Sequence, residues 1–294
     1  MSRQGVFAKV FGYIAEGVGV DAPLYDRTLI KAEAAEYLRR IGLDRFARRL
    51  SGESGVCWGL AELNAMILAH QHCVPFENLD TFLYNRVPSL RTDDLFDKIV
   101  MRRRGGWCFE LNSLFFSLIS ATGYSVTAHT ADVCRSGAFA SVNNLSAHRV
   151  NLVRIDDKAY FCDVGFGGTM PGFAVEWRDY MPESGAGGVF FFEPGIDGHK
   201  TLVHMSGKTN KALLRVGPKP FRGEDFLEAN RYTALSGESR FNKFRLAYLK
   251  KADGLLRLKG DELILERDGA EEKVAVDESK IRYVLGHKFG IRLD

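Results

Sequence analysis

The hydrophobic pattern of this 294-residue chain changes its period near Gly123, and this change constrains the fold more than any other feature. Up to about Thr122 the apolar residues recur at helical spacing, as in residues 29–41 and 60–69. From Tyr124 to roughly Val216, β-branched and aromatic residues alternate along the chain between glycine turns, which is the pattern of strands. The sequence therefore predicts an α+β protein in which a helical part precedes an open sheet or small barrel.

The last part of the chain mixes the two patterns. A helical stretch at 224–230 precedes a hairpin-like segment at 254–265, and a closing helix is expected near 279–285. Three domains are therefore predicted: residues 1–122, an N-terminal extension and a helical bundle; residues 123–216, a β domain; and residues 217–294, an α/β domain.

Composition agrees with a soluble enzyme, and the cysteine usage indicates the reducing cytoplasm. Forty basic and thirty-seven acidic side chains give a net charge of +3, too small to indicate nucleic acid as a partner. No segment is long and apolar enough to predict a membrane span, and Lys9 and Glu16 interrupt the first apolar run, so no leader is expected. The cysteines lack a Cys-x-x-Cys pair, so neither a disulfide framework nor a metal site is expected: Cys57, Cys73, Cys108, Cys134 and Cys162.

A cysteine stands where a glycine turn opens a predicted helix. Residues 104–112 read Arg-Gly-Gly-Trp-Cys-Phe-Glu-Leu-Asn, and from Leu111 the apolar side chains follow helical spacing to near Gly123. Cys108 is thus expected in the first turn, where free backbone N–H groups and the helix dipole favour a thiolate. Free cysteines are also often ordinary buried residues, so a nucleophile requires a base and an orienting group elsewhere in the chain.

Two downstream segments supply those groups. His148 lies in a predicted strand at 147–153, and Asp163 ends a second strand that leads into a glycine-rich loop. Residues 155–158, Ile-Asp-Asp-Lys, predict a hairpin turn between the two strands. In that hairpin His148 and Asp163 are offset rather than directly opposite, and a bend at Gly165 is needed to bring them together.

These segments resemble those of the arylamine N-acetyltransferase family. That family carries Arg-Gly-Gly-x-Cys-Phe-Glu-Leu-Asn, His-x-x-Asn-Leu-Val and Asp-Val-Gly-Phe-Gly, which stand here around Cys108, His148 and Asp163. Weaker similarities at 37–42, at 75–80 and in the C-terminal part extend the resemblance over roughly residues 35 to 260.

The resemblance implies a fold and a reaction. The fold would be a helical bundle that carries the nucleophile, a β-barrel that carries the histidine and aspartate, and an α/β lid. The reaction would transfer an acetyl group from acetyl-coenzyme A to Cys108 and then to an arylamine or hydrazine, with ping-pong kinetics. His148 would act as the base and Asp163 would orient it, while the Cys108 N–H would supply one donor to the oxyanion.

The resemblance also implies substrate contacts. Phe76 and Phe166 are predicted near the acceptor amine, and Gly167 and Gly168 beside the pantetheine arm of the coenzyme. Each has a plain structural alternative, because aromatic side chains usually fill cores and glycines after a strand usually form turns.

Four charged residues lie near Cys108 in the sequence. Arg102, Arg103 and Arg104 could attract the acidic coenzyme, but a run of charges more often forms a solvated face, and Arg104 could instead anchor the loop. Glu110 is expected to be structural, since its carboxylate suits the start of a helix.

Some features of the chain depart from the family pattern. About thirty residues with Phe7, Phe11 and Tyr13 precede the first matching motif, and they could pack on the bundle, close part of the pocket or contact a second subunit in a homodimer. Asp132 stands where the family usually has arginine, and residues 169–173 replace a usual proline-leucine continuation. These changes bear on the substrate rather than on the triad.

Other functions remain open at this point. The nearest is an amide synthase-type acyltransferase with the same triad, which would take a carrier-bound or longer acyl donor. A cysteine hydrolase would use the same three residue types. A catalytically idle binding protein would keep the fold but carry an unreactive Cys108.

Overall fold

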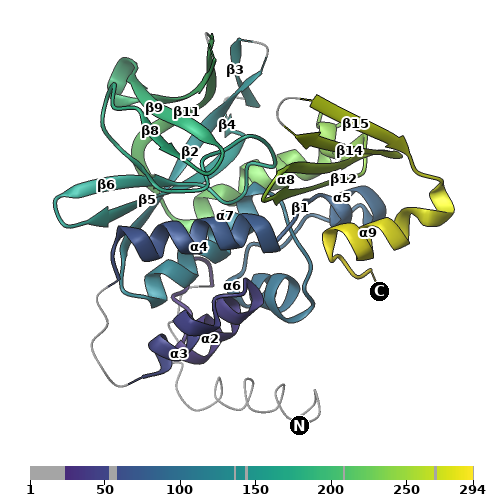
Figure 1. Ribbon diagram of the computed structural model, residues 1–294, viewed down its shortest axis with the longest axis horizontal. Helices are drawn as coiled ribbons and strands as arrows, with labels where there is room; N and C mark the ends of the chain where they lie inside the picture. Colours follow the sequence, from purple (N-terminus) through teal and green to yellow (C-terminus); the bar gives the residue numbers. More distant parts are fainter. Residues whose placement is uncertain are drawn as a thin grey trace.

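The structure is a computed structural model that describes residues 24–52, 58–135, 137–142, 145–207, 209–267 and 270–293. Residues 1–23 of the predicted extension, with Phe7, Phe11 and Tyr13, lie outside these ranges. Helices gather at one side of the molecule and two sheets at the other, so the α+β prediction is confirmed (Figure 1).

The described residues of the helical part form seven helical segments, and the last of them ends where the hydrophobic period of the sequence changes. They are α2 (Lys31–Arg40), α3 (Asp44–Ser51), α4 (Leu60–Cys73), α5 (Leu79–Tyr84), α6 (Thr92–Leu95), the π-helical turn η1 (Phe96–Met101) and α7 (Cys108–Ala121). The α7 helix is buried on nearly all sides, because α2 and α6 pack on one side of it and strands β2 and β5 on another. The start of a helix at Cys108 and its end before Gly123 are therefore confirmed.

In the described residues the larger sheet has ten antiparallel strands, and it curls into a nearly closed barrel. Its order is β7-β6-β5-β2-β11-β10-β9-β8, with β3 on β2 and β4 on β3. An isolated bridge links Asp179, just after the edge strand β7, to Phe192 of β9, the strand next to the other edge. The strands are β2 (Ser125–Arg135), β3 (Ala138–Val142), β4 (Leu145–Ser146), β5 (His148–Ile155), β6 (Lys158–Cys162), β7 (Val175–Glu176), β8 (Glu183–Gly185), β9 (Gly188–Pro194), β10 (Lys200–Ser206) and β11 (Thr209–Phe221).

The predicted hairpin of the site strands is confirmed. β5 and β6 pair antiparallel from Ile155–Lys158 to Asn151–Cys162, with Asp156 in the left-handed region at φ 52°. β5 is more buried than its alternation predicts, since Arg149 and Asn151 are as completely covered as Val150. The helix α7 covers one face of this strand and the barrel core the other.

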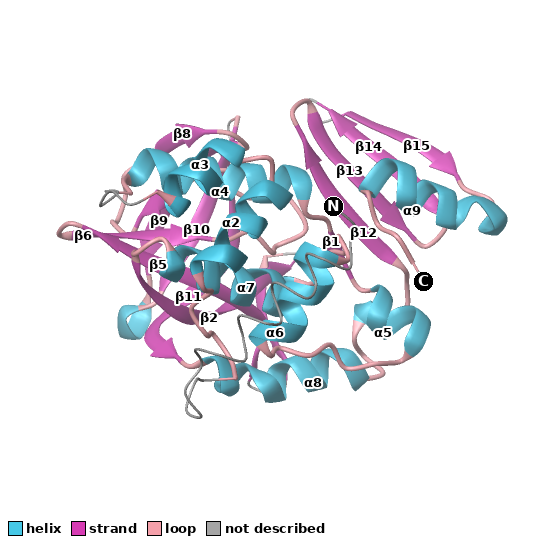
Figure 2. Ribbon diagram, turned by 90° about the horizontal axis from the view of Figure 1, so that it is seen from below, coloured by secondary structure: helices cyan, strands magenta, loops and turns pink. Residues whose placement is uncertain are grey.

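The second sheet carries the closing helix on one face (Figure 2). Its order is β1-β12-β13-β14-β15, all antiparallel, from β1 (Phe76–Glu77), β12 (Leu246–Lys251), β13 (Gly254–Lys259), β14 (Glu262–Arg267) and β15 (Ala270–Ala275). The predicted hairpin at 254–265 is β13–β14, and the predicted closing helix is α9 (Ile281–Phe289), which begins two residues later and ends four later than expected. Leu285 and Phe289 of α9 share a core with Leu258 of the sheet.

The first and last parts of the chain are interleaved. β1 comes from the helical part yet pairs with β12, with Phe76 opposite Tyr248. The predicted helix at 224–230 is the 3-10 turn η3 (Gly223–Phe226) followed by α8 (Leu227–Leu235), and its Asn230 accepts a hydrogen bond from Nε1 of Trp107. The division of the chain at 122 and 216 stays a prediction.

Candidate active site

The turn before α7 is built by close backbone contacts. A Cβ atom on Gly105 would lie 2.0 Å from the carbonyl oxygen of Pro75, so only glycine fits there. The N–H of Glu77 donates to the carbonyl of Gly106 at 2.9 Å, which ties this turn to β1. The direction in which the chain enters α7 is therefore fixed by a neighbouring strand.

Two buried acidic residues hold the same turn. The Glu110 carboxylate accepts from the N–H of Trp107 at 3.0 Å and from Nζ of Lys98 at 2.7 Å, so it is structural, as expected. Arg104 donates to Glu77 at 2.7 Å and to Asp80 at 3.0 Å, and these bonds agree with the anchoring alternative. Burial acts to lower the pKa of Lys98, but its carboxylate neighbours raise it, so the ammonium stays charged.

The three candidate triad residues meet at the junction of α7 and the barrel. Cys108 is the first residue of α7, and its Sγ lies 3.7 Å from the carbonyl oxygen of Ala147. His148 follows Ala147 as the first residue of β5, and its Nε2 lies 2.6 Å from Oδ2 of Asp163. His148 and Asp163 are only 3% and 2% exposed, so solvent screens this pair weakly.

His148 and Asp163 are offset in the β5–β6 hairpin, so the chain must bend after β6 to bring them together. The side chain of Asn112 stabilises this bend. Its Nδ2 donates to Oδ1 of Asp163 at 2.9 Å, and its Oδ1 accepts from the N–H of Val164 at 2.9 Å. The N–H of Gly165 also donates to the Asp163 carboxylate, at 2.8 Å. These bonds turn the chain after β6 so that the carboxylate faces His148.

Asn112 was not predicted as a site residue, although the sequence carried a signal. It stands four residues after Cys108, so the two side chains lie on the same face of the helix. A polar amide on that face of an otherwise apolar helix requires a partner in the core.

The charges of the site favour a protonated imidazole. Burial lowers the pKa of His148, but the Asp163 carboxylate and the Cys108 sulfur raise it by more, so the pKa is about 10. The imidazole is therefore expected to be protonated at neutral pH, and a protonated imidazole beside a cysteine favours its thiolate.

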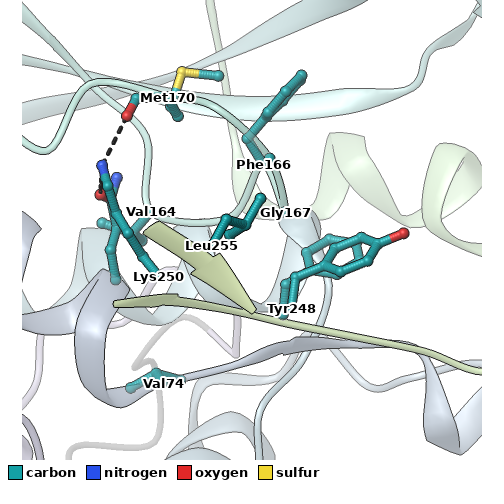
Figure 3. A pocket seen from close by; sticks show the side chains of 11 residues that line it. Val74, Val164, Phe166, Gly167, Met170, Tyr248, Lys250 and Leu255 are labelled. Atoms are coloured by element: carbon teal, nitrogen blue, oxygen red, sulfur yellow. Dashed lines mark hydrogen bonds between the residues drawn. The ribbon is translucent and has the colours of Figure 1, made fainter. Parts of the chain in front are cut away.

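A cavity of about 190 Å³ opens onto the thiol. Cys108 and His148 line it together with Arg135 of β2, Phe166 of the loop after β6, and Arg240, which lies in the 3-10 turn η4 (Arg240–Asn242) before β12. A second, smaller cavity of about 40 Å³ adjoins the first (Figure 3). The two cavities share four lining residues, Phe76, Phe166, Gly167 and Tyr248. Gly168 and Lys250 line only the smaller cavity.

The predicted substrate residues all lie at these cavities. Phe76 stacks on Tyr248 at a ring distance of 5.6 Å, and Phe166 stands edge-on to the His148 ring at 5.6 Å. A Cβ atom on Gly167, which has φ +68°, would lie 2.8 Å from the Tyr248 ring, so the loop passes as close as glycine permits. Their roles toward a substrate stay predictions.

Lys250 fastens the loop that follows Asp163. Its Nζ donates to the carbonyl of Met170 at 2.9 Å, drawn in Figure 3, and to Oε1 of Gln71 at 3.0 Å. Gln71 in turn donates to the carbonyls of Asp163 and Pro171. Burial lowers the pKa of Lys250 to about 8. One side chain from β12 and one from α4 thus hold the loop from both sides.

Two absences apply only to the described part of the chain. No group of three His, Cys, Asp or Glu side chains there could hold a metal ion. None of the helices in the described ranges is long and apolar enough to cross a bilayer.

The site brings together a thiol at a helix start, a buried imidazole and a carboxylate hydrogen-bonded to that imidazole, which are the three groups that cysteine-dependent enzymes use. A family model described as N-acetyltransferase matches residues 59–294. The arylamine N-acetyltransferase of Mycolicibacterium smegmatis is 28% identical over 260 residues, which cover 87% of this chain and 91% of the relative.

Solved structures agree with this match. The M. smegmatis arylamine N-acetyltransferase structure has a TM-score of 0.77 at 26% identity, and the match covers 88% of this chain and 92% of the chain of that structure. The Salmonella typhimurium arylamine N-acetyltransferase structure has a TM-score of 0.79 at 24% identity, covers 90% and 92%, and shows the shared fold. The chain belongs to the arylamine N-acetyltransferase family, and it is an acetyltransferase.

Proposed function

We propose that this enzyme transfers an acetyl group from acetyl-coenzyme A to an arylamine or hydrazine through a thioester on Cys108. The observation that carries the proposal is the position of His148, with Asp163 2.6 Å from its Nε2 and the Cys108 sulfur close enough to raise its pKa. Because Nε2 is occupied by the carboxylate, the other ring nitrogen, Nδ1, is left for the thiol.

The first half-reaction acetylates the thiol. The Cys108 thiolate attacks the carbonyl carbon of the donor, and the N–H of Cys108 at the start of α7 stabilises the oxyanion. The C–S bond to the coenzyme then breaks, and the leaving thiolate takes the proton from His148. This step leaves acetyl-Cys108 and a neutral imidazole.

The second half-reaction passes the acetyl group to the amine. Acetylation removes the negative charge of the sulfur, which is one of the causes that raise the pKa of His148. The imidazole is then more readily neutral and takes a proton from the attacking amine. When the tetrahedral intermediate collapses to the amide, the Cys108 thiolate and the imidazolium are restored.

The two cavities suggest separate routes for the substrates. Phe166 and Phe76 offer aromatic faces beside the thiol for the acceptor ring. Gly167 and Gly168 line the smaller cavity and would let the pantetheine arm pass close to the backbone.

Intact-protein mass spectrometry tests this proposal directly. Mixing with acetyl-coenzyme A should add one acetyl group, and adding an aromatic amine or hydrazine should remove it. The Cys108→Ala variant should show no adduct. If Cys108 is readily alkylated but forms no acetyl adduct, the acetyl donor is wrong, and a longer or carrier-bound acyl donor takes its place.

A further inference from the structure

A charged side chain is buried directly after His148 in strand β5. Arg149 is 0% exposed, and the rings of Phe116 and Phe226 cover its guanidinium, with their centres at 5.6 and 4.8 Å. In the part of the chain that the structure describes, its Nε and Nη1 atoms have no hydrogen-bond partner. An apolar side chain of similar volume is often at least as stable in such a place. The burial of Arg149 therefore requires an explanation other than stability.

The carboxylate that pairs with Arg149 comes from the N-terminal segment. Oδ1 of Asp26 accepts from Nη2 of Arg149 at 2.7 Å and from Oγ of Ser113 at 2.8 Å. Ser113 lies in α7, the helix that begins at Cys108. One carboxylate oxygen therefore ties the strand that carries His148 to the helix that carries the thiol.

The segment that carries Asp26 is fastened to the helical part independently of Arg149. The next residue, Arg27, pairs with Glu33 of α2 at 2.9 Å and with Asp93 of α6 at 2.6 Å. These pairs fix the backbone beside Asp26 on two helices. The carboxylate can therefore restrain β5 rather than follow its movements.

The backbone of Arg149 is connected to the triad. Its carbonyl accepts from Nδ2 of Asn112 at 2.6 Å, and the same Nδ2 donates to Oδ1 of Asp163 at 2.9 Å. A shift of β5 at Arg149 would thus move His148 directly and Asp163 through Asn112. Small displacements of reacting groups cost large factors in rate.

Building on the proposed function, we infer that Asp26 and Arg149 are positioning residues that hold the imidazole and the carboxylate of the triad in contact and so keep the thiol reactive. The pair acts through the backbone of β5 and through Asn112, and neither member lines the two cavities at the site. Asp26 also lies outside residues 59–294, which match the family model. The N-terminal segment of this chain thus supplies a part of the site that the family model does not contain.

The test measures how fast iodoacetamide alkylates Cys108 at different pH values, with peptide mass mapping to identify the thiol. In the wild-type enzyme the His148 imidazolium keeps the thiolate present at about pH 6.5. Asp26→Ala removes the restraint on β5, so the rate at about pH 6.5 should fall about tenfold relative to the rate at about pH 9, where ordinary thiols ionise. The kcat should fall about tenfold or more, while the KM for acetyl-coenzyme A stays within about twofold.

Two further variants separate positioning from stability. Asp93→Ala is the matched control, because it breaks the Arg27–Asp93 pair of the same segment and leaves Arg149 untouched. It should keep the wild-type alkylation profile and kcat. Asp26→Ala leaves a buried charge unpaired and lowers stability, so the double variant Asp26→Ala with Arg149→Met removes that charge as well. Its urea midpoint should return toward the wild-type value, while its kcat and its alkylation rate at about pH 6.5 stay low.

Two results would overturn the inference. A folded Asp26→Ala enzyme could keep the wild-type alkylation profile and kcat. The double variant could recover activity together with stability, which would show that the ion pair has a structural role only.

The alkylation measurement also separates this inference from the proposed function, because it needs neither an acetyl donor nor an acceptor. If wild-type Cys108 forms no acetyl adduct but its alkylation depends on Asp26 as described, the acetyl-transfer proposal fails and the inference stands. If the adduct forms and the alkylation profile is the same in the wild type, Asp26→Ala and the double variant, the inference fails and the proposed function stands.

Discussion

The two oxygen atoms of the Asp163 carboxylate are divided between two tasks. Oδ2 faces His148, while Oδ1 accepts from the Asn112 amide and from the N–H of Gly165. The motifs predicted the carboxylate and the imidazole, and the structure shows what holds them in contact. The sequence did not predict that Arg135 and Arg240 line the same cavity, because neither residue stands in a motif and only the tertiary fold brings them together.

The pH dependence of stability should report the charge of His148. In the folded protein Asp163 and Cys108 raise its pKa to about 10 despite burial, whereas an unfolded histidine has a value of about 6.5. The folded state therefore binds more protons between these values, so this contribution to stability is complete below about pH 6.5 and is lost as pH rises toward 10. Asp163→Asn should remove on the order of 2 kcal/mol near pH 6.5 and progressively less at higher pH.

Urea denaturation at several pH values between about 6 and 10 measures this difference. The wild-type and Asp163→Asn curves of unfolding free energy against pH should converge toward alkaline pH. Asparagine can keep the bonds from Asn112 and Gly165 through its Oδ1, so the geometry of the loop is preserved. Parallel curves would show that His148 is not held as an imidazolium.

Replacing the sulfur tests the nucleophile itself. Cys108→Ser should lose nearly all acetyl transfer, because a neutral hydroxyl cannot form the ion pair with His148. Stability should change little, since serine occupies almost the same volume. Cys73→Ser is the matched control, a half-buried thiol outside both cavities, and it should keep its activity. Turnover by the Cys108→Ser enzyme at the wild-type rate would reject the thioester mechanism.

At the scale of elements, the turn before α7 depends on a contact that leaves no room for a side chain. Gly105→Ala should destabilise the protein by about 2–3 kcal/mol, because the new methyl group would overlap the Pro75 carbonyl and push β1 away. Gly237→Ala is the control, since a Cβ atom there meets nothing within 4 Å. Chemical denaturation of the two variants gives the comparison, and equal stabilities would show that the turn adjusts freely.

The elements that sequence predicted well are those with strong local patterns. Helix α7 has an apolar stripe, a glycine turn before it and a glycine after it, and the β5–β6 hairpin has Asp156-Asp157 at its turn. The strand β1 was not predicted, because its two residues become a strand only by pairing with β12. The burial of Arg149 also escaped prediction, since it depends on Asp26 reaching it from a distant segment at 2.7 Å.

At the scale of the whole molecule, the second sheet completes the cavity that the bundle and barrel begin. Arg240, Phe241 and Tyr248 line it opposite Cys108, and no local pattern in the sequence places them there. What positions them is a contact across the fold, the side chain of Asn78 after β1. Its Nδ2 donates to the carbonyls of Phe241 and Phe244 at 2.8 and 2.7 Å.

Asn78→Ala should therefore weaken both stability and activity. It removes those two bonds and a third, from the N–H of Leu246 to Oδ1 of Asn78 at 2.7 Å, and it leaves polar groups unpaired in the interior. A loss of about 2–4 kcal/mol is expected. Because Phe241 and Arg240 shift with the segment they stand on, kcat/KM should fall even under conditions where the variant is fully folded.

Asn210→Ala, at an exposed position near the start of β11, is the control, with a change within about 0.5 kcal/mol. A folded Asn78→Ala enzyme with wild-type kinetics would contradict this prediction. It would show that Arg240 and Phe241 line the cavity without the Asn78 hydrogen bonds.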